Sequence, residues 1–116
     1  MDTTVEWSLL LDFYGELLTS RQRELCDLSF NQDLSLSEIA ENTGVSRQAV
    51  HDSLRRAEAA LLEFEEKTGC VSRARQTAAA AHTIRMAAET LDRSSDPTVH
   101  AAAESILAAL AGLETL

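Results

Sequence analysis

The side chains with the clearest potential for recognition chemistry lie between residues 46 and 56. This stretch holds three arginines and one aspartate, so its local charge is +2 in a chain whose formal net charge is −9. Arginine and glutamine donate hydrogen bonds to base edges in the major groove, and arginine also pairs with backbone phosphates. The candidate nucleic-acid-binding residues are therefore Ser46, Arg47, Gln48, His51, Arg55 and Arg56.

Catalytic and metal-binding patterns match the remaining reactive side chains poorly. His51, His82 and His100 fall on three different predicted helices, with no nucleophile or carboxylate pattern near them. Cys26 and Cys70 are far apart and match no metal-ligand spacing, and Cys26 lies in an apolar row that predicts burial. No glycine-rich phosphate loop is present. We therefore predict that the protein is not an enzyme and uses no metal and no cofactor.

The candidate residues are positioned by a segment, from Leu36 to Val50, with the layout of a helix-turn-helix. Ala40 is small where the second helix crosses close to the first. Gly44 adopts the positive φ of the turn without a Cβ clash. Val45 fills the space beneath the turn, and Val50 holds the second helix against the core. Together with Ile39 and a serine cap, this pattern predicts a DNA-recognition type of helix beginning after Ser46.

Helix signals surround this motif. Thr19 with Gln22 and Ser35 with Glu38 form capping boxes, and Ser46 caps the next helix. Apolar residues at three- and four-residue steps predict one amphipathic helix before Thr19 and a long one after Ser46. The first row is Trp7, Leu10, Leu11, Tyr14, Leu17 and Leu18, a second is Leu25, Cys26 and Leu28, and the long helix has Val50, Leu54, Ala57, Leu61 and Phe64.

Composition changes after Gly69, which resembles a helix C-cap. We predict a helix-turn-helix domain at 1–69 and an alanine-rich antiparallel helical hairpin at 70–116, with Asp96 and Pro97 beginning its second helix. Its predicted apolar rows are Ala74, Ala78, Ala81, Ile84, Ala88 and Leu91, then Val99, Ala103, Ile106, Leu110 and Leu113. Small alanine rows bury little area, so the hairpin is expected to pack on the first domain or on a second copy. We predict a homodimer.

The acidic balance of the chain sets the choice of partner. Duplex binding depends on counterion release by several basic residues near phosphates. Acidic residues around the motif repel DNA, whereas an acidic surface complements a basic, RNA-binding protein. No run of about 18 apolar residues exists, so we predict no membrane insertion. An acidic N-terminus and only two cysteines predict a cytoplasmic location.

Several segments resemble the YlxM family of small bacterial helix-turn-helix proteins. The resemblance runs from about Leu10 to Gly69. It is carried by Leu10-Leu-Asp-Phe-Tyr-Gly-Glu-Leu-Leu-Thr19, Arg21-Gln-Arg-Glu24, Asp33-Leu-Ser-Leu-Ser-Glu-Ile-Ala-Glu41, Val45-Ser-Arg-Gln-Ala-Val-His-Asp52 and Glu65-Glu-Lys67. The same core is similar to region 4 of sigma factors, which reads promoter DNA. The family is associated with the signal recognition particle pathway mainly through the shared operon of its GTPases. The resemblance therefore implies an accessory or regulatory protein that binds the particle's GTPase or its RNA. The alternative is a sequence-specific DNA-binding transcriptional regulator.

Overall fold

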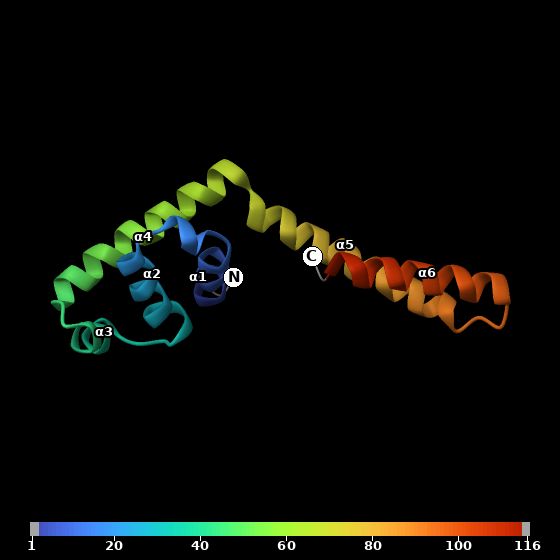
Figure 1. Cartoon of the computed structure of the whole chain (residues 1–116), viewed down its shortest axis with the longest axis horizontal. Helices are drawn as coiled ribbons and strands as arrows, with labels where there is room; N and C mark the ends of the chain where they lie inside the picture. Colours follow the sequence, from blue (N-terminus) through green and yellow to red (C-terminus); the bar gives the residue numbers. More distant parts are fainter. Residues whose placement is uncertain (1–2, 115–116) are drawn as a thin grey trace. The chain divides into compact units, whose positions relative to one another are not determined.

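All regular structure between residues 3 and 114 is helical. The computed structural model describes this range, which contains six α-helices and no strand (Figure 1). In chain order the helices are α1 (Thr3–Tyr14), α2 (Ser20–Cys26), α3 (Leu36–Thr43), α4 (Arg47–Thr68), α5 (Cys70–Asp92) and α6 (Pro97–Glu114). The predicted all-helical fold, with a long helix after the turn, is confirmed.

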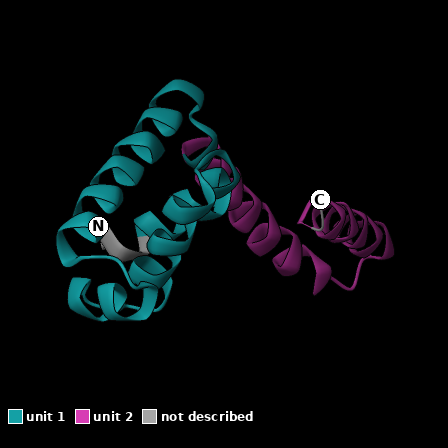
Figure 2. Ribbon diagram, turned by 60° about the vertical axis from the view of Figure 1, so that its left-hand side comes forward, with its two compact units in different colours: residues 1–71 teal, residues 72–116 magenta. Residues whose placement is uncertain are grey.

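The chain forms two compact units, residues 1–71 and residues 72–116 (Figure 2). Unit 1 contains α1 to α4, and unit 2 contains most of α5 and all of α6. The first two residues of α5 belong to unit 1, because Val71 is only 4% exposed and packs in its core. No helix within residues 3–114 is long and apolar enough to cross a membrane.

The core of unit 1 is built where α1, α2 and α3 pack against α4. Leu25, Ile39, Val50 and Leu61 are fully buried, which agrees with the predicted apolar rows. Cys26 is also fully buried, and loss of solvent raises the pKa of its thiol to about 12. The core is therefore a continuous apolar cluster in which each helix contributes one face.

Aromatic side chains extend this core toward its two ends. Trp7 stacks on Phe30 with ring centroids 5.6 Å apart, and Tyr14 lies 5.9 Å from Phe64. The Tyr14 hydroxyl donates to Glu65 Oε1 at 2.6 Å and lies 2.7 Å from Thr68 Oγ1. Burial, followed by the bond to Glu65, raises the pKa of Tyr14, so its hydroxyl stays protonated. These contacts fix the end of α4 against α1.

The helix boundaries of unit 1 follow the local signals closely. Thr19 accepts from the Gln22 N–H while Gln22 accepts from the Thr19 N–H, and Ser35 and Glu38 make the same reciprocal pair. Gly44 ends α3 with φ of 74°, and Gly69 ends α4 with φ of 65°. Both predicted capping boxes and the predicted glycine turn are confirmed.

The first apolar row is shorter than predicted. The α-helix ends at Tyr14 and tightens into a 3-10 turn over Gly15–Leu17, which leaves Leu17 64% exposed. The chain must reverse here to reach the capping box at Thr19, so the last turn of the periodic pattern does not continue as an α-helix. Residue Leu28 lies in a π-helical turn over Asp27–Asn31, beyond the end of α2.

Unit 2 is a hairpin of α5 and α6. Asp96 accepts from the Thr98 N–H at 2.9 Å, and Pro97 is the first residue of α6, as predicted. The predicted inward row of α5 is wrong at Ile84 and Leu91, which are 46% and 47% exposed, while Ala88 is buried. The predicted row of α6 is wrong at Ile106 and Leu113, which are also exposed, and right at Ala103 and Leu110. The face of α5 that meets α6 instead contains Arg85 and Asp92, which pair with residues of α6.

Candidate nucleic-acid interface

The turn between α3 and α4 holds the N-terminal end of α4. Ser46 Oγ accepts from the Ala49 N–H at 3.1 Å, so the predicted cap is present. Ile39 and Val50 are fully buried on the two sides of the turn, and Val45 packs against the same core. The first turns of α4 are therefore fixed to α3 by packing, while their other side faces solvent.

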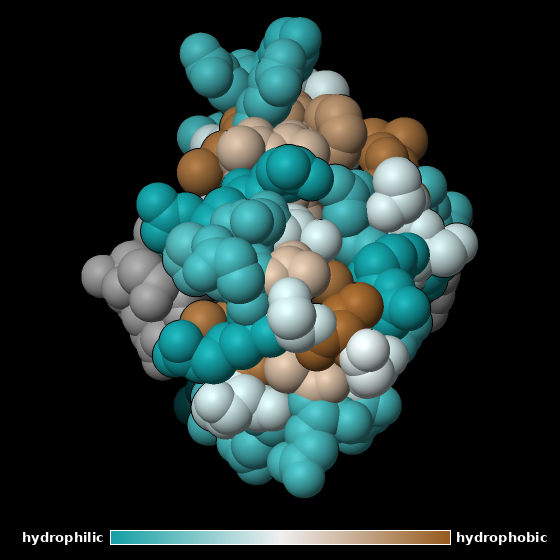
Figure 3. Space-filling view, turned by 90° about the vertical axis from the view of Figure 1, so that its left-hand side faces the viewer, coloured by the Kyte–Doolittle hydropathy of each residue, from teal (hydrophilic) through white to brown (hydrophobic). Residues whose placement is uncertain are grey.

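Every candidate side chain is exposed at this end of unit 1. Gln48, His51 and Arg55 share the face of α4 opposite the buried Val50, and Arg47 lies beside them in the first turn. Arg56 lies on the other side of that face, and Ser46 is occupied by capping. In Figure 3, viewed from the side of α3 and the start of α4, hydrophilic side chains cover most of the surface around smaller hydrophobic patches.

Asp52 lies in the middle of this face and engages two of the candidates. Gln48 Nε2 donates to Asp52 Oδ1 at 2.9 Å, and His51 Nδ1 lies 3.5 Å from the same oxygen. The Gln48 amide would have to leave this carboxylate before it contacts a base. By contrast, the guanidinium groups of Arg47, Arg55 and Arg56 have no hydrogen-bond or ion-pair partner within residues 3–114. The positive charge of these three arginines is therefore available to a ligand, but the Asp52 carboxylate lies among them on the same helix.

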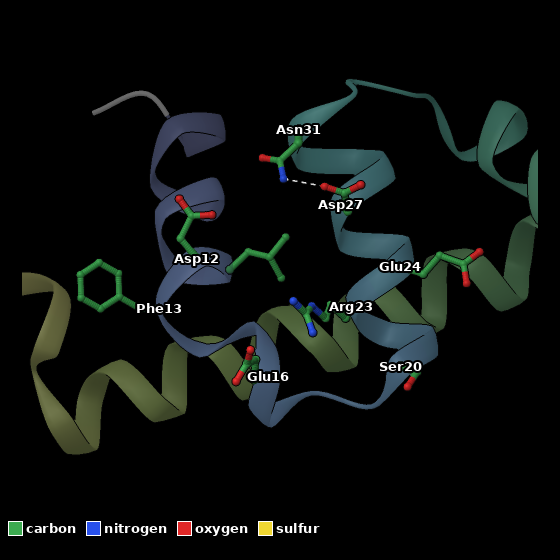
Figure 4. A pocket seen from close by; sticks show the side chains of 9 residues that line it. Asp12, Phe13, Glu16, Ser20, Arg23, Glu24, Asp27 and Asn31 are labelled. Carbon is green, nitrogen blue, oxygen red and sulfur yellow. Dashed lines mark hydrogen bonds between the residues drawn. The ribbon is translucent and has the colours of Figure 1, made fainter.

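The rest of unit 1 is strongly acidic. Residues 1–71 contain six lysines and arginines against fourteen aspartates and glutamates, a formal charge of −8, whereas residues 72–116 carry −1. A pocket of about 670 Å³ lies between α1, α2 and the turn that follows α2. Figure 4 shows Arg23 extending into this space among acidic side chains. Its lining residues are Leu11, Asp12, Phe13, Glu16, Ser20, Arg23, Glu24, Asp27 and Asn31.

A second cluster of charge, in unit 2, was not predicted. His100 Nδ1 lies 3.1 Å from Asp92 Oδ1 and 2.8 Å from the Asp92 carbonyl oxygen, and Nε2 lies 3.0 Å from Glu104 Oε1. The carbonyl of Asp92, followed by the two carboxylates, raises the pKa of His100. The prediction that no histidine has carboxylates nearby is wrong at this position. The i,i+4 spacing of His100 and Glu104 was a signal for it, whereas Asp92 comes from the other helix.

Comparison with known proteins decides the family. The family described as "Putative helix-turn-helix protein, YlxM / p13 like" matches residues 1–97. The chain belongs to this YlxM / p13-like family. It is 54% identical over 67 residues to a UPF0122 protein of Clostridium kluyveri and 57% identical over 65 residues to one of Symbiobacterium thermophilum. It is 37% identical over 116 residues to one of Halalkalibacterium halodurans, covering 100% of this chain and 98% of the relative.

The matches of highest identity cover only part of the chain. The matches to the proteins of C. kluyveri and S. thermophilum cover 58% and 56% of this chain and 60% and 61% of the relatives, so the chain spans about three fifths of their length. Membership of the YlxM / p13-like family establishes a helix-turn-helix protein. This class favours binding to nucleic acid or to a partner protein over catalysis.

Proposed function

We propose that this protein is an accessory or regulatory protein of the signal recognition particle pathway that acts by binding the pathway's GTPase. The observation that supports it most is the separation of charge: −8 on the helix-turn-helix unit, with +2 confined to residues 46–56. The pathway is inferred from the family's association with it. The kind of partner is inferred from the charge, which favours a basic protein over a polyanion.

Electrostatics give this partner choice a physical basis. At physiological salt the Debye length is about 8 Å, so charges spread over unit 1 act mainly on a partner that comes close. A basic surface docking there gains from many carboxylates at once, and its approach is accelerated by the same field. A nucleic-acid duplex approaching the same surface is repelled, unless it contacts only the beginning of α4.

The acidic pocket is the part of unit 1 best suited to such contact. Four carboxylates and the Arg23 guanidinium line it, so its formal charge is −3: Asp12 and Glu16 lie near the end of α1, and Glu24 and Asp27 lie across the pocket. Both oxygens of Asp27 already accept side-chain hydrogen bonds, which leaves the other three carboxylates for a partner. Exposed Phe13 adds an aromatic ring against which the aliphatic stem or the cation of an arginine or lysine can pack. The pocket combines charge with apolar contact.

The test is binding to the purified GTPase at about 0.15 M salt, with and without particle RNA. The pair Asp12→Asn and Glu16→Gln removes two charges at the pocket, and the matched pair Glu66→Gln and Glu89→Gln removes two exposed charges elsewhere. We expect saturable binding to the GTPase without RNA, weakened about tenfold or more by the pocket pair and little by the control pair. No binding to the GTPase would refute the proposal, and binding that requires the RNA would assign the RNA as the partner.

A second candidate function, DNA-binding regulation, is favoured by the three arginines of α4 that lack partners in the described part of the chain. Arg47→Ala with Arg55→Ala should then abolish binding to a promoter duplex, whereas Arg93→Ala, an exposed arginine of unit 2, should not. Duplex affinity at physiological salt that is lost in the first pair would establish this alternative. Duplex affinity indifferent to both variants would exclude α4 as the reading helix.

A further inference from the structure

Two rows of uncharged residues run along the outside of the hairpin. In α5 the row is Thr77, Ala80, Ile84, Ala87 and Leu91, and in α6 it is Val99, Ala102, Ile106, Ala109 and Leu113, each with steps of three, four, three and four. This is the spacing of residues that meet another helix in a bundle. Nine of the ten are exposed, including Ile106 at 38% and Leu113 at 62%, and Val99 is half-buried.

Both rows lie on the same face of the hairpin. Successive helical residues differ by about 100°, so Ile84 and Leu91 lie about 80° around α5 from the side that meets α6. Ile106 and Leu113 lie about 60° around α6, in the same sense, from the buried Ala103 and Leu110. The ion pairs Asp92–His100 and Arg85–Glu114 show that the helices are antiparallel. Offsets of similar size and the same sense on antiparallel neighbours place the two rows on one side of the hairpin, which we call the uncharged hairpin face.

The chemistry of this face limits what can cover it. None of its ten residues is charged, and the positions along its outer edges are also uncharged: Gln76, Thr83, Thr90, Thr98, Ser105 and Gly112. A partner recognised through ion pairs finds no complement there. Large and small residues alternate along both rows, so isoleucine and leucine of one hairpin can fit over the alanines of another. Such a pattern is complementary to itself, as an isologous interface requires.

We propose that the uncharged hairpin face binds the same face of a second copy, forming a four-helix bundle. Among residues 72–114 only Ala88, Ala103 and Leu110 are buried, which is a small core for two helices of 23 and 18 residues. A second copy supplies the missing burial. Association through unit 2 also brings together surfaces of charge −1, whereas association through unit 1 would oppose two surfaces of −8.

The size of the face sets the expected strength. An 18-residue helix is about 27 Å long, and two adjacent helices are about 20 Å wide, giving roughly 500 Å² per copy. This is near the lower limit for specific interfaces, so we expect dissociation in the range of about 1–100 μM. The inference is independent of the proposed function, because no residue of unit 1 takes part in it.

The experiment is sedimentation equilibrium of the full chain from about 1 to 300 μM, which brackets this range. The variant pair Ile84→Glu and Ile106→Glu places two charges on the face. The matched control, Met86→Glu with Ala101→Glu, places them on the opposite face, where Met86 is 52% exposed. We expect a concentration-dependent dimer for the wild type and the control, and a monomer at every concentration for the first pair.

A second variant pair separates dimer loss from misfolding. Ile84→Ala with Ile106→Ala keeps strong helix formers at both positions, so ellipticity at 222 nm should be retained while dimer affinity falls about tenfold or more. Tryptophan fluorescence from Trp7 reports the integrity of unit 1 in every variant. A monomeric wild type at 300 μM overturns the proposal, as does a dimer that persists in the Ile84→Glu and Ile106→Glu pair.

Discussion

Substitution of Gly44 tests how much the left-handed turn residue contributes to the stability of the helix-turn-helix. The φ of Gly44 is 74°, and a Cβ built on it would meet no atom within 4 Å. Replacement by alanine therefore adds no clash, and the whole effect comes from the backbone. An L-residue with a Cβ costs about 1–2 kcal/mol in the left-handed region. Alanine also reduces the entropy of the unfolded chain, which offsets about 0.4–1 kcal/mol. We expect Gly44→Ala to lower the free energy of unfolding of unit 1 by about 1 kcal/mol.

The assay is urea unfolding followed by the fluorescence of Trp7, the only tryptophan, which lies in unit 1. For a domain of this size the slope is about 1 kcal/mol/M, so the midpoint should fall by about 1 M. Gly44→Asn should lose less, because asparagine tolerates this conformation better than alanine. Gly112→Ala, inside α6 and also in open space, should instead raise the stability of unit 2, as measured at 222 nm.

A midpoint unchanged by Gly44→Ala would refute the reasoning, because it would mean that the turn does not need positive φ. A loss as large in Gly44→Asn as in Gly44→Ala would also contradict it, since the cost would then not depend on left-handed preference. In either case the angle between α3 and α4 would have to be set by packing of Ile39 and Val50 alone.

Three further perturbations test contacts in both units. Tyr14→Phe removes the hydroxyl that bonds Glu65 and Thr68, and should cost unit 1 about 1–2 kcal/mol by Trp7 fluorescence; no loss would mean water replaces it. Because burial raises the pKa of Cys26 to about 12, a disulfide reagent at pH 8 should modify Cys70 rapidly and Cys26 only in urea. Two equally fast thiols would contradict that burial. Because the contacts with Asp92 and Glu104 raise the pKa of His100, its protonated form stabilises the hairpin; this contribution is complete below the unfolded pKa and is lost as pH rises through the folded value. The melting temperature followed at 222 nm should therefore fall as the pH rises above the unfolded pKa of about 6.5 in the wild type and stay level in His100→Gln. Parallel profiles would exclude the His100 contacts as the cause.

Local sequence signals were sufficient to predict the helix boundaries of unit 1, because each signal depends on only a few neighbouring residues. A capping box is complete within three residues, and a glycine turn within one, so Thr19, Ser35 and Gly44 could be read without knowing what packs nearby. The row of α4 was also clear, since Val50, Leu54 and Leu61 are separated by charged residues. The prediction was wrong at the end of α1, where the chain reverses toward Thr19 and Leu17 does not continue the α-helix.

The inward face of α5 could not be read in the same way. Alanines occupy so many positions that the row through Ala81 and Ala88 can continue equally well through Ile84 and Leu91 or through Arg85 and Asp92. Charged residues are normally placed outside, which favoured the first choice. Their partners, Glu114 and His100, come from α6, so the pairing depends on tertiary structure. At the candidate interface Gln48 and Asp52 are four residues apart, a spacing that permits their hydrogen bond, although we did not predict it.

One measurement, the salt dependence of binding, tests the proposed dimer and the two candidate functions together. One copy offers three arginines on α4 without partners among the described residues, so binding to a duplex would give a slope of log affinity against log salt of about −2.7, and a dimer using both copies about −5.4. The Ile84→Glu and Ile106→Glu pair, which leaves α4 untouched, should then halve the slope. Binding of a basic protein through the acidic pocket has no reason to change in this way, because the pocket is complete within one copy. A slope that is halved would therefore support both the dimer and DNA recognition, whereas GTPase binding indifferent to the pair would support the accessory role.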